Sequence, residues 1–251
     1  MKLNENIFIK QGDSLQIIKS LPNEYVDLII TDPPYGIDYQ SNYKKEKFDK
    51  LENDDNLNWF QEFSDQSFRI LKNNSAIYCF TRADVYSTMF DAFIKSGFKF
   101  RNLIFCPKAN VGGNGDLMSS FTTGHELILY FNKGRRKFEK TEILKPSEVY
   151  LNDKRKSPKE YLFRLPSLWH WCKSTEHNLK MQHPTQKSVE VFESMVQISS
   201  RQNDIILDPF AGVFASGIAC LKNNRKYIGY ELDEKYFEIG KNRLEERLKE
   251  M

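Results

Sequence analysis

The chain has 251 residues, of which 40% are hydrophobic and 28% charged, with a formal net charge of +3. The length is sufficient for one large α/β domain or two small ones, and the composition is typical of a globular chain and excludes a disordered one. The four cysteines form no CxxC pair and no apolar run reaches membrane-spanning length, so we predict no metal site, no disulfide framework, no membrane segment and a cytoplasmic location.

Short apolar runs alternate with segments of helical periodicity in the first half of the chain. Residues 25–31, "YVDLIIT", are expected to form a strand buried on both faces. Residues 58–74 have the spacing of a helix, which Asn73-Asn74 is expected to end. Further strands are predicted at 75–80, 100–107 and 125–134, and a further helix at 83–97.

The same alternation returns in the last third of the chain. Helices are predicted at 184–200, 216–224 and 234–251, and strands at 204–210 and 225–232. Strands that alternate with helices indicate a mostly parallel sheet covered on both faces. Residues 132–180 interrupt this rhythm, so we interpret the chain as one catalytic domain, 1–251, with an inserted recognition element.

The stretch from 132 to 160 is basic. It holds ten Lys or Arg against five Asp or Glu, so it carries +5 and the rest of the chain −2. The simpler interpretation is a solvated loop of mixed charge, and the alternative is a surface that contacts phosphates. The basic residues considered for such a surface are Arg135, Arg136, Lys154 and Arg155.

Two predicted strands end in an aspartate, a proline and an aromatic residue, in "LIITDPPY" and "IILDPFAG". Ligands of open parallel sheets bind outside the carboxyl ends of the strands, so adjacent strands would direct both loops into one crevice. In the second loop, Asp208 can order a tight turn and Gly212 permits close backbone approach to a ligand. Glu231 follows 23 residues later at the next strand end, a spacing typical of ribose binding. An ordinary strand-to-helix turn is the alternative.

The first loop, "DPPY" at 32–35, is stiff and poor in donors, because neither proline has an N–H. The Asp32 carboxylate and nearby carbonyls therefore face a ligand as acceptors, beside the ring of Tyr35. This arrangement suits the exocyclic amine of adenine or cytosine. Acceptors that hold both amine protons free the nitrogen lone pair for attack in the transition state. A surface Pro-Pro turn is the alternative.

These motifs resemble those of the amino-group DNA methyltransferases, which use S-adenosylmethionine. "TDPPYG" resembles their catalytic motif, "DPFAG" their cofactor motif, and "HPTQKS" (183–188) and "QGDSLQIIKSLP" (11–22) the segments that precede these. The motif order is that of the β group, and the likeness extends over about residues 10–245. The resemblance implies a Rossmann-like sheet, mostly parallel with one antiparallel strand, in circularly permuted order. It also implies a target-recognition region at 132–180 and a mobile loop at 40–55.

The resemblance assigns roles to individual residues. Those that would hold and stack a flipped base are Asp32, Pro33, Pro34 and Tyr35. Those that would bind the cofactor are Asp13, Asp208, Phe210, Ala211, Gly212, Glu231, Thr185 and Lys187. Of these, Glu231 would bind the ribose, Asp13 would lie beside the adenine pocket, and Lys187 would lie near the cofactor carboxylate.

Other residues have two interpretations. His125 is a candidate DNA contact, with a structural His125–Glu126 pair as the alternative. The run Trp169-His170-Trp171 suits nucleic-acid stacking, but core packing is commoner for tryptophan.

The chain departs from the family pattern at four positions. Phe214 stands where a second glycine is usual, and its ring is expected to crowd the cofactor or rearrange the loop. Val213 replaces a small polar residue, Ser188 a proline, and Cys106 a tryptophan.

We therefore expect a DNA-binding enzyme that methylates N6 of adenine, because DPPY with aspartate is typical of N6-adenine members. N4-cytosine methylation is the alternative among enzymes. A non-catalytic nucleic-acid-binding relative is the alternative that Phe214 raises. A homodimer and a cognate restriction endonuclease are considered as further partners. A nicotinamide-dependent dehydrogenase would leave the Pro-Pro-Tyr motif unexplained, and no GxGxxG follows a strand.

Overall fold

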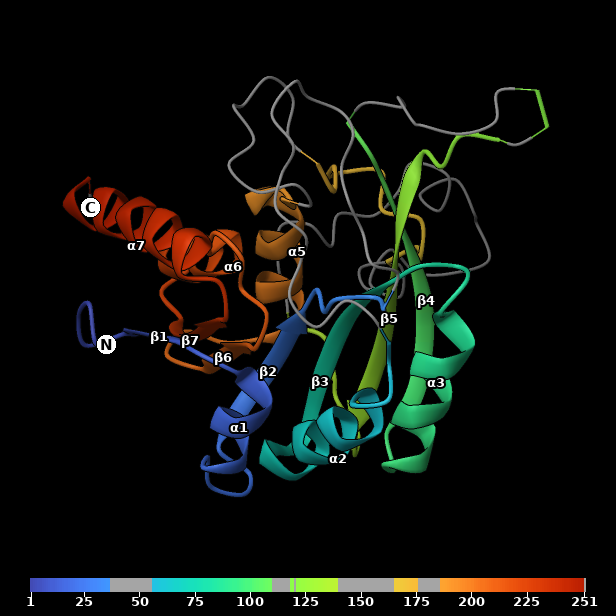
Figure 1. Cartoon of the computed structure of the whole chain (residues 1–251), viewed down its shortest axis with the longest axis horizontal. Helices are drawn as coiled ribbons and strands as arrows, with labels where there is room; N and C mark the ends of the chain where they lie inside the picture. The colour runs from blue at the N-terminus through green and yellow to red at the C-terminus, as the bar shows by residue number, and fades with distance from the viewer. Residues whose placement is uncertain (37–55, 110–117, 120, 140–164, 176–185, 251) are drawn as a thin grey trace, which may run out of the picture.

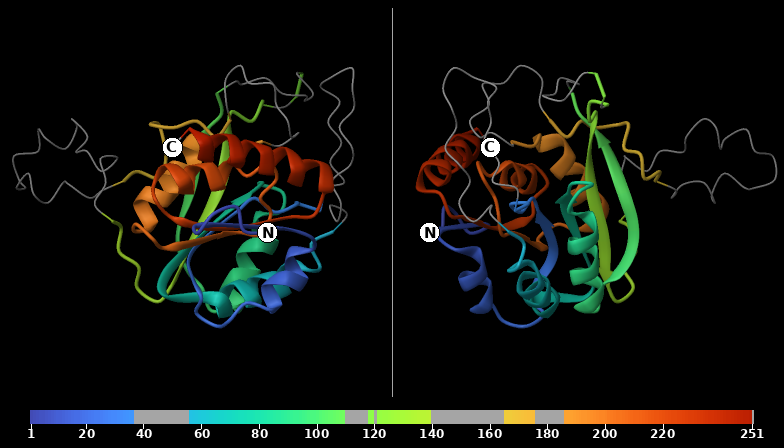
Figure 2. Two further views of the ribbon diagram at one scale, coloured as in Figure 1. Left: turned by 90° about the vertical axis from the view of Figure 1, so that its left-hand side faces the viewer. Right: turned by 45° about the vertical axis from the view of Figure 1, so that its right-hand side comes forward.

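The computed structural model describes residues 1–36, 56–109, 118–119, 121–139, 165–175 and 186–250. These residues form one sheet with helices on both faces (Figures 1 and 2). The predicted mobile loop at 40–55 lies outside the described residues.

The described residues contain a seven-stranded sheet of order β1-β7-β6-β2-β3-β5-β4. Within this sheet β5 alone runs opposite to the other strands, so the prediction of a mostly parallel sheet with one antiparallel strand is confirmed. The strands are β1 (Ile7–Gln11), β2 (Val26–Thr31), β3 (Leu71–Thr81), β4 (Lys99–Pro107), β5 (His125–Lys133), β6 (Ile205–Asp208) and β7 (Lys226–Glu231).

In the described part of the chain, helices cover both faces of the sheet (Figures 1 and 2). One face carries α1 (Ser14–Lys19), α2 (Phe60–Ile70) and α3 (Tyr86–Lys95), and the other carries α5 (Val189–Ser199), α6 (Ala215–Lys222) and α7 (Glu234–Lys249). None of the helices in the described ranges is long and apolar enough to cross a membrane.

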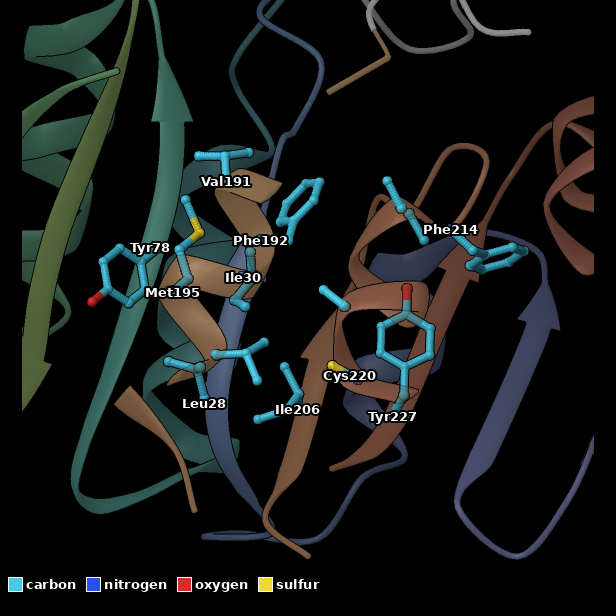
Figure 3. Packing of buried hydrophobic residues seen from close by; sticks show 14 of the residues in the cluster. Leu28, Ile30, Tyr78, Val191, Phe192, Met195, Ile206, Phe214, Cys220 and Tyr227 are labelled. Carbon is cyan, nitrogen blue, oxygen red and sulfur yellow. The ribbon is translucent and has the colours of Figure 1, made fainter. Parts of the chain in front are cut away.

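Strand β2 is buried on both faces because its side chains alternate between two cores. Leu28 and Ile30 lie in the core beneath α5 and α6, where Figure 3 shows them beside Met195 and Ile206. Ile29 belongs to the core beneath the first three helices. The continuous apolar run in the sequence therefore indicated this position correctly.

The strand order reverses between β2 and β6. Leu28 pairs with Ile206 and Ile29 with Leu207, and the chain extends from β2 toward β3 and from β6 toward β7. Such a switch point is where open α/β sheets bind their ligands. The two strands that lead to Asp32 and Asp208 are thus adjacent, which is the condition under which both loops would face one crevice.

The structure corrects several predicted boundaries. Strand β3 begins at Leu71, which is buried and pairs with Val26, so Asn73-Asn74 lies within a strand and does not end the preceding helix. Helix α5 begins only at Val189, because Ser188 provides its N-terminal cap. Strand β1 and helix α1 were not predicted as elements, because β1 is a five-residue edge strand with mostly exposed side chains.

Candidate active site

Asp32 follows β2 directly, and both of its carboxylate oxygens accept hydrogen bonds. The Tyr35 hydroxyl donates to Oδ1 at 2.6 Å, and Lys187 Nζ donates to Oδ2 at 2.7 Å. The Asp32 side chain is only 15% exposed and that of Lys187 only 7%. Asp32 of the DPPY motif and Lys187 of the HPTQKS motif are far apart in sequence. The fold therefore brings a predicted catalytic carboxylate into contact with a predicted cofactor residue.

Burial raises the pKa of Tyr35 well above its ordinary value, and the Asp32 charge and hydrogen bond act in the same direction. Tyr35 therefore keeps its proton at neutral pH and serves as a donor to Asp32. Pro33 is buried beside it, whereas Pro34 is partly exposed.

Lys187 is held in place by the start of α5. Ser188 caps this helix by accepting a hydrogen bond from the Val191 N–H at 3.3 Å, and its hydroxyl donates to the Lys173 carbonyl. The ammonium group of Lys187 lies 5.0 Å from the centre of the Phe80 ring. Serine at the position of the usual proline is thus a good helix start.

Asp208, at the end of β6, organises the second loop. Its carboxylate is buried and accepts hydrogen bonds from the Phe210 N–H at 3.2 Å and from the Ser216 hydroxyl at 2.5 Å. The Ser216 oxygen also lies 2.9 Å from the Tyr227 hydroxyl. Burial raises the pKa of Asp208 to about 7, although both hydrogen bonds oppose this rise. Asp208 therefore stabilises the loop that follows β6 through its hydrogen bond with the Phe210 N–H.

Glu231 ends β7 and joins that strand to the loop. It accepts hydrogen bonds from the Gly212 N–H at 2.7 Å and from the Asp233 N–H at 3.0 Å. Burial raises its pKa to about 7. Gly212 has φ +52°, a left-handed conformation that glycine adopts without strain.

Asp13 lies at the end of the neighbouring strand β1, whose Gln11 pairs with Glu231. Asp13 is exposed and caps α1 by accepting a hydrogen bond from the Leu15 N–H at 2.8 Å. The structure thus places Asp13 and Glu231 at adjacent strand ends.

An aromatic group that the sequence did not single out lies beside the second loop. The Phe210 ring lies 5.5 Å from the rings of both Trp59 and Phe63. Ala211 is anchored by its N–H, which donates to the Tyr230 carbonyl at 2.8 Å. In the sequence, Trp59 falls within the helix predicted at 58–74, and no motif links it to the loop.

Phe214 does not crowd this loop as expected. Its backbone is left-handed, with φ +56°, so it adopts the conformation suited to the glycine usual at this position. Its side chain is fully buried, with ring centres 6.3 Å from Tyr227 and 5.8 Å from Phe237. Figure 3 shows Phe214 and Tyr227 within this core. The neighbouring Val213 is also buried.

Residues 165–175 run beside β4 and contribute to the core. Trp169 is 3% exposed, which confirms core packing as its role, whereas His170 is exposed. Cys106 is buried 3.8 Å from Cys172, sulfur to sulfur, so it packs against this segment in place of the usual tryptophan.

Two basic residues of the predicted phosphate surface, Arg135 and Arg136, do not lie at this edge. Arg135 and Arg136 follow the end of β5, which lies at the opposite edge because β5 is antiparallel. Arg136 pairs with Glu139 at 3.1 Å and is 13% exposed. His125 is at the same edge as Asp32 and packs on Phe105 with 5.3 Å between ring centres.

Three predicted residues, Lys154, Arg155 and Thr185, lie outside the described part of the chain. Glu126, which the sequence suggested only as a partner of His125, forms an ion pair with Lys108 at 3.0 Å near the Asp32 site.

The sequence and the fold both match known DNA methylases. Residues 26–242 match the DNA methylase family of N6 and N4 methyltransferases. The type II methyltransferase M.HpaI of Haemophilus parainfluenzae is 30% identical over 241 residues, which cover 93% of this chain and 73% of that protein. The DNA adenine methyltransferase YhdJ of Escherichia coli strain K12 is 27% identical, with coverages of 96% and 84%. The crystal structure of the M1.HpyAVI–S-adenosylmethionine complex is similar with a TM-score of 0.69 at 27% identity, with coverages of 95% and 98%.

Replacing Asp208 with asparagine should change how stability depends on pH. The folded state holds the Asp208 proton more tightly than the unfolded state does. The stability that protonated Asp208 contributes is therefore fully present below pH 3.8 and is lost as the pH rises to about 7. We expect the melting temperature of Asp208→Asn to decline less between pH 4.5 and 7.5 than that of the wild type. Asp84 serves as the control, because its hydrogen bond with Arg82 lowers its pKa, and Asp84→Asn should keep the wild-type slope. Parallel slopes for Asp208→Asn and wild type would contradict the assignment.

Phe214→Gly should destabilise the protein although glycine fits the backbone there. Loss of the buried ring outweighs relief of the left-handed conformation, so the free energy of unfolding should drop by roughly 2–3 kcal/mol. Denaturant unfolding measures this change, and Phe214→Leu, which retains apolar bulk, should lose less. A Phe214→Gly variant as stable as the wild type would show that the ring is not part of the core.

Proposed function

The chain belongs to the DNA methylase family, and we propose that it transfers the methyl group of S-adenosylmethionine to the N6 amine of adenine in DNA. The observation that carries this proposal is the position of Asp32 at the sheet's switch point, with Tyr35 and Lys187 on its two oxygens. Its neighbour β6 ends in the loop of the predicted cofactor motif.

The residues at the ends of β6 and β7 fit S-adenosylmethionine. When bound, this cofactor supplies a methyl group carried on a sulfonium cation. Both Glu231 oxygens accept backbone N–H groups, and a carboxylate has about four acceptor sites, so Glu231 can also accept a ribose hydroxyl. The Phe210 ring and the nearby carboxylates suit a cation. Asp13 at the adjacent strand end would approach the adenine.

The Asp32 carboxylate and the carbonyls of the two prolines would accept hydrogen bonds from the amine of the target base. Asp32 accepts an amine proton while Tyr35, held by its hydrogen bond, provides a flat surface against the base. Holding the amine proton favours the tetrahedral nitrogen that forms in the transition state. A base within a duplex cannot reach a partly buried carboxylate, so we infer that the target base is flipped out.

Adenine is proposed over cytosine because of the aspartate in DPPY, and the name of YhdJ as a DNA adenine methyltransferase supports this choice. N4-cytosine methylation is the second candidate, because Asp32 would hold either amine in the same way. A non-catalytic role loses its main support, because the Phe214 ring is packed in the core.

The DNA would approach the edge that carries Asp32 and His125. Arg135 and Arg136 lie at the opposite edge, so their location does not favour contact with the same stretch of DNA. A phosphate role for Lys154 and Arg155, a homodimer, a cognate endonuclease and a cytoplasmic location stay predictions.

Asp32→Ala should abolish most methyl transfer while cofactor binding survives. Loss of one group that stabilises a transition state costs on the order of 100- to 1000-fold in rate, and Asp32 is not among the proposed cofactor residues. Single-turnover rates with duplex DNA and calorimetric titration with S-adenosylmethionine measure the two effects. Asp91→Ala, on an exposed position of α3, is the matched control. Wild-type rates in Asp32→Ala would refute the proposed mechanism.

A further inference from the structure

Glu126 lies at the same edge of the sheet as Asp32, although it comes from the antiparallel strand. The pairing of Leu127 with Thr81 places the start of β5 beside the end of β3, and β3 is the direct neighbour of β2. Glu126 is the second residue of β5, so it stands where the parallel strands end.

Glu126 and Lys187 also share one face of the sheet. Phe80 pairs with Ile128, both belong to the core beneath α5, and the Lys187 ammonium lies over the Phe80 ring. Side chains two residues apart on a strand point to the same face, so Glu126 points as Ile128 does. Its partner on β4, Cys106, belongs to the same core.

The charges around Glu126 agree with this placement. Burial by itself raises the pKa of Glu126, but the positive charges of Lys187 and Lys108 outweigh burial and lower the pKa overall. Lys108 forms a 3.0 Å ion pair with Glu126, whose side chain is 15% exposed. Glu126 also contributes to the raised pKa of Tyr35. Glu126 is therefore an ionised carboxylate that acts on the Asp32 site.

Lys187 thus contacts one carboxylate, Asp32, and acts electrostatically on a second, Glu126, at the same edge and on the same face of the sheet. Its contact with Asp32 Oδ2 competes with any amine that must donate to the same oxygen. A lysine ammonium on its flexible stem can change partners, provided that a second anion keeps it neutralised.

We propose that Glu126 is a positioning residue. When the amine of the target base binds to Asp32, Lys187 would exchange its ion pair with Asp32 for one with Glu126. Lys108, paired with Glu126, holds the carboxylate in place for this exchange. Asp32 then offers Oδ2 to the amine, and the buried charges stay paired throughout. This inference rests on the proposed function, because it concerns the same methyl-transfer site.

The test is Glu126→Gln, which keeps the shape of the side chain and removes its charge. Lys187 should then stay on Asp32, and the single-turnover rate of methylation should decrease by up to about 100-fold, the cost of a misplaced catalytic group. The affinity for S-adenosylmethionine should not change. Glu126→Asp, which restores the charge, should recover most of the rate. Glu139→Gln, at the opposite edge, is the matched control and should behave as the wild type.

A double-mutant cycle with Lys187→Met decides whether Glu126 acts through Lys187. If it does, adding Glu126→Gln to Lys187→Met causes no further loss of rate. The role of Glu126 would be overturned if the rate losses of the two substitutions multiply in the double mutant, or if Glu126→Gln has the wild-type rate. In either case, methylation by the wild type leaves the proposed function intact. A wild type that forms no methylated base would instead remove both. Thermal unfolding of each variant confirms that it is folded.

Discussion

The pairing of β2 with β6 is the constraint on which the site depends. Both strands are short and apolar, and such strands are stable only when both of their faces are covered. Once they are paired, Asp32, which follows β2, and Asp208, which ends β6, emerge at the same edge of the sheet. Helix α5 packs over the same region and delivers Lys187 to Asp32. Burial of the sheet thus assembles the site.

The proposed catalytic and cofactor halves of the site place their carboxylates in different surroundings. In the catalytic half, Lys187 neutralises Asp32 and helps to neutralise Glu126. In the cofactor half, Asp208 and Glu231 are held by backbone N–H groups and a hydroxyl, and burial raises the pKa of each to about 7. A cationic sulfonium is favourable beside such carboxylates, because it supplies the missing positive charge in a poorly solvated place. This asymmetry suits a cofactor that is cationic and a base that is neutral.

The sequence predicted a mostly parallel sheet and placed the two aspartate loops at strand ends, because apolar runs and strand ends are local signals. The single antiparallel strand was implied by the family resemblance. It did not predict that Lys187 would contact Asp32, since only the packing of α5 on the sheet determines that distance. The expectation that the Phe214 ring would crowd the cofactor was also wrong. A motif comparison shows which residue replaces glycine, but it does not show that the side chain packs into the core. Likewise, Asn73-Asn74 resembles a helix end, and pairing with β2 extended the strand across it.

Product analysis tests the central claim most directly. The purified protein is incubated with labelled S-adenosylmethionine and duplex DNA of mixed sequence, and the DNA is digested to nucleosides that are identified by mass. The account predicts N6-methyladenine. N4-methylcytosine would contradict the choice of base while retaining the amine mechanism, and no methylated base from a folded protein that binds the cofactor would contradict the account as a whole.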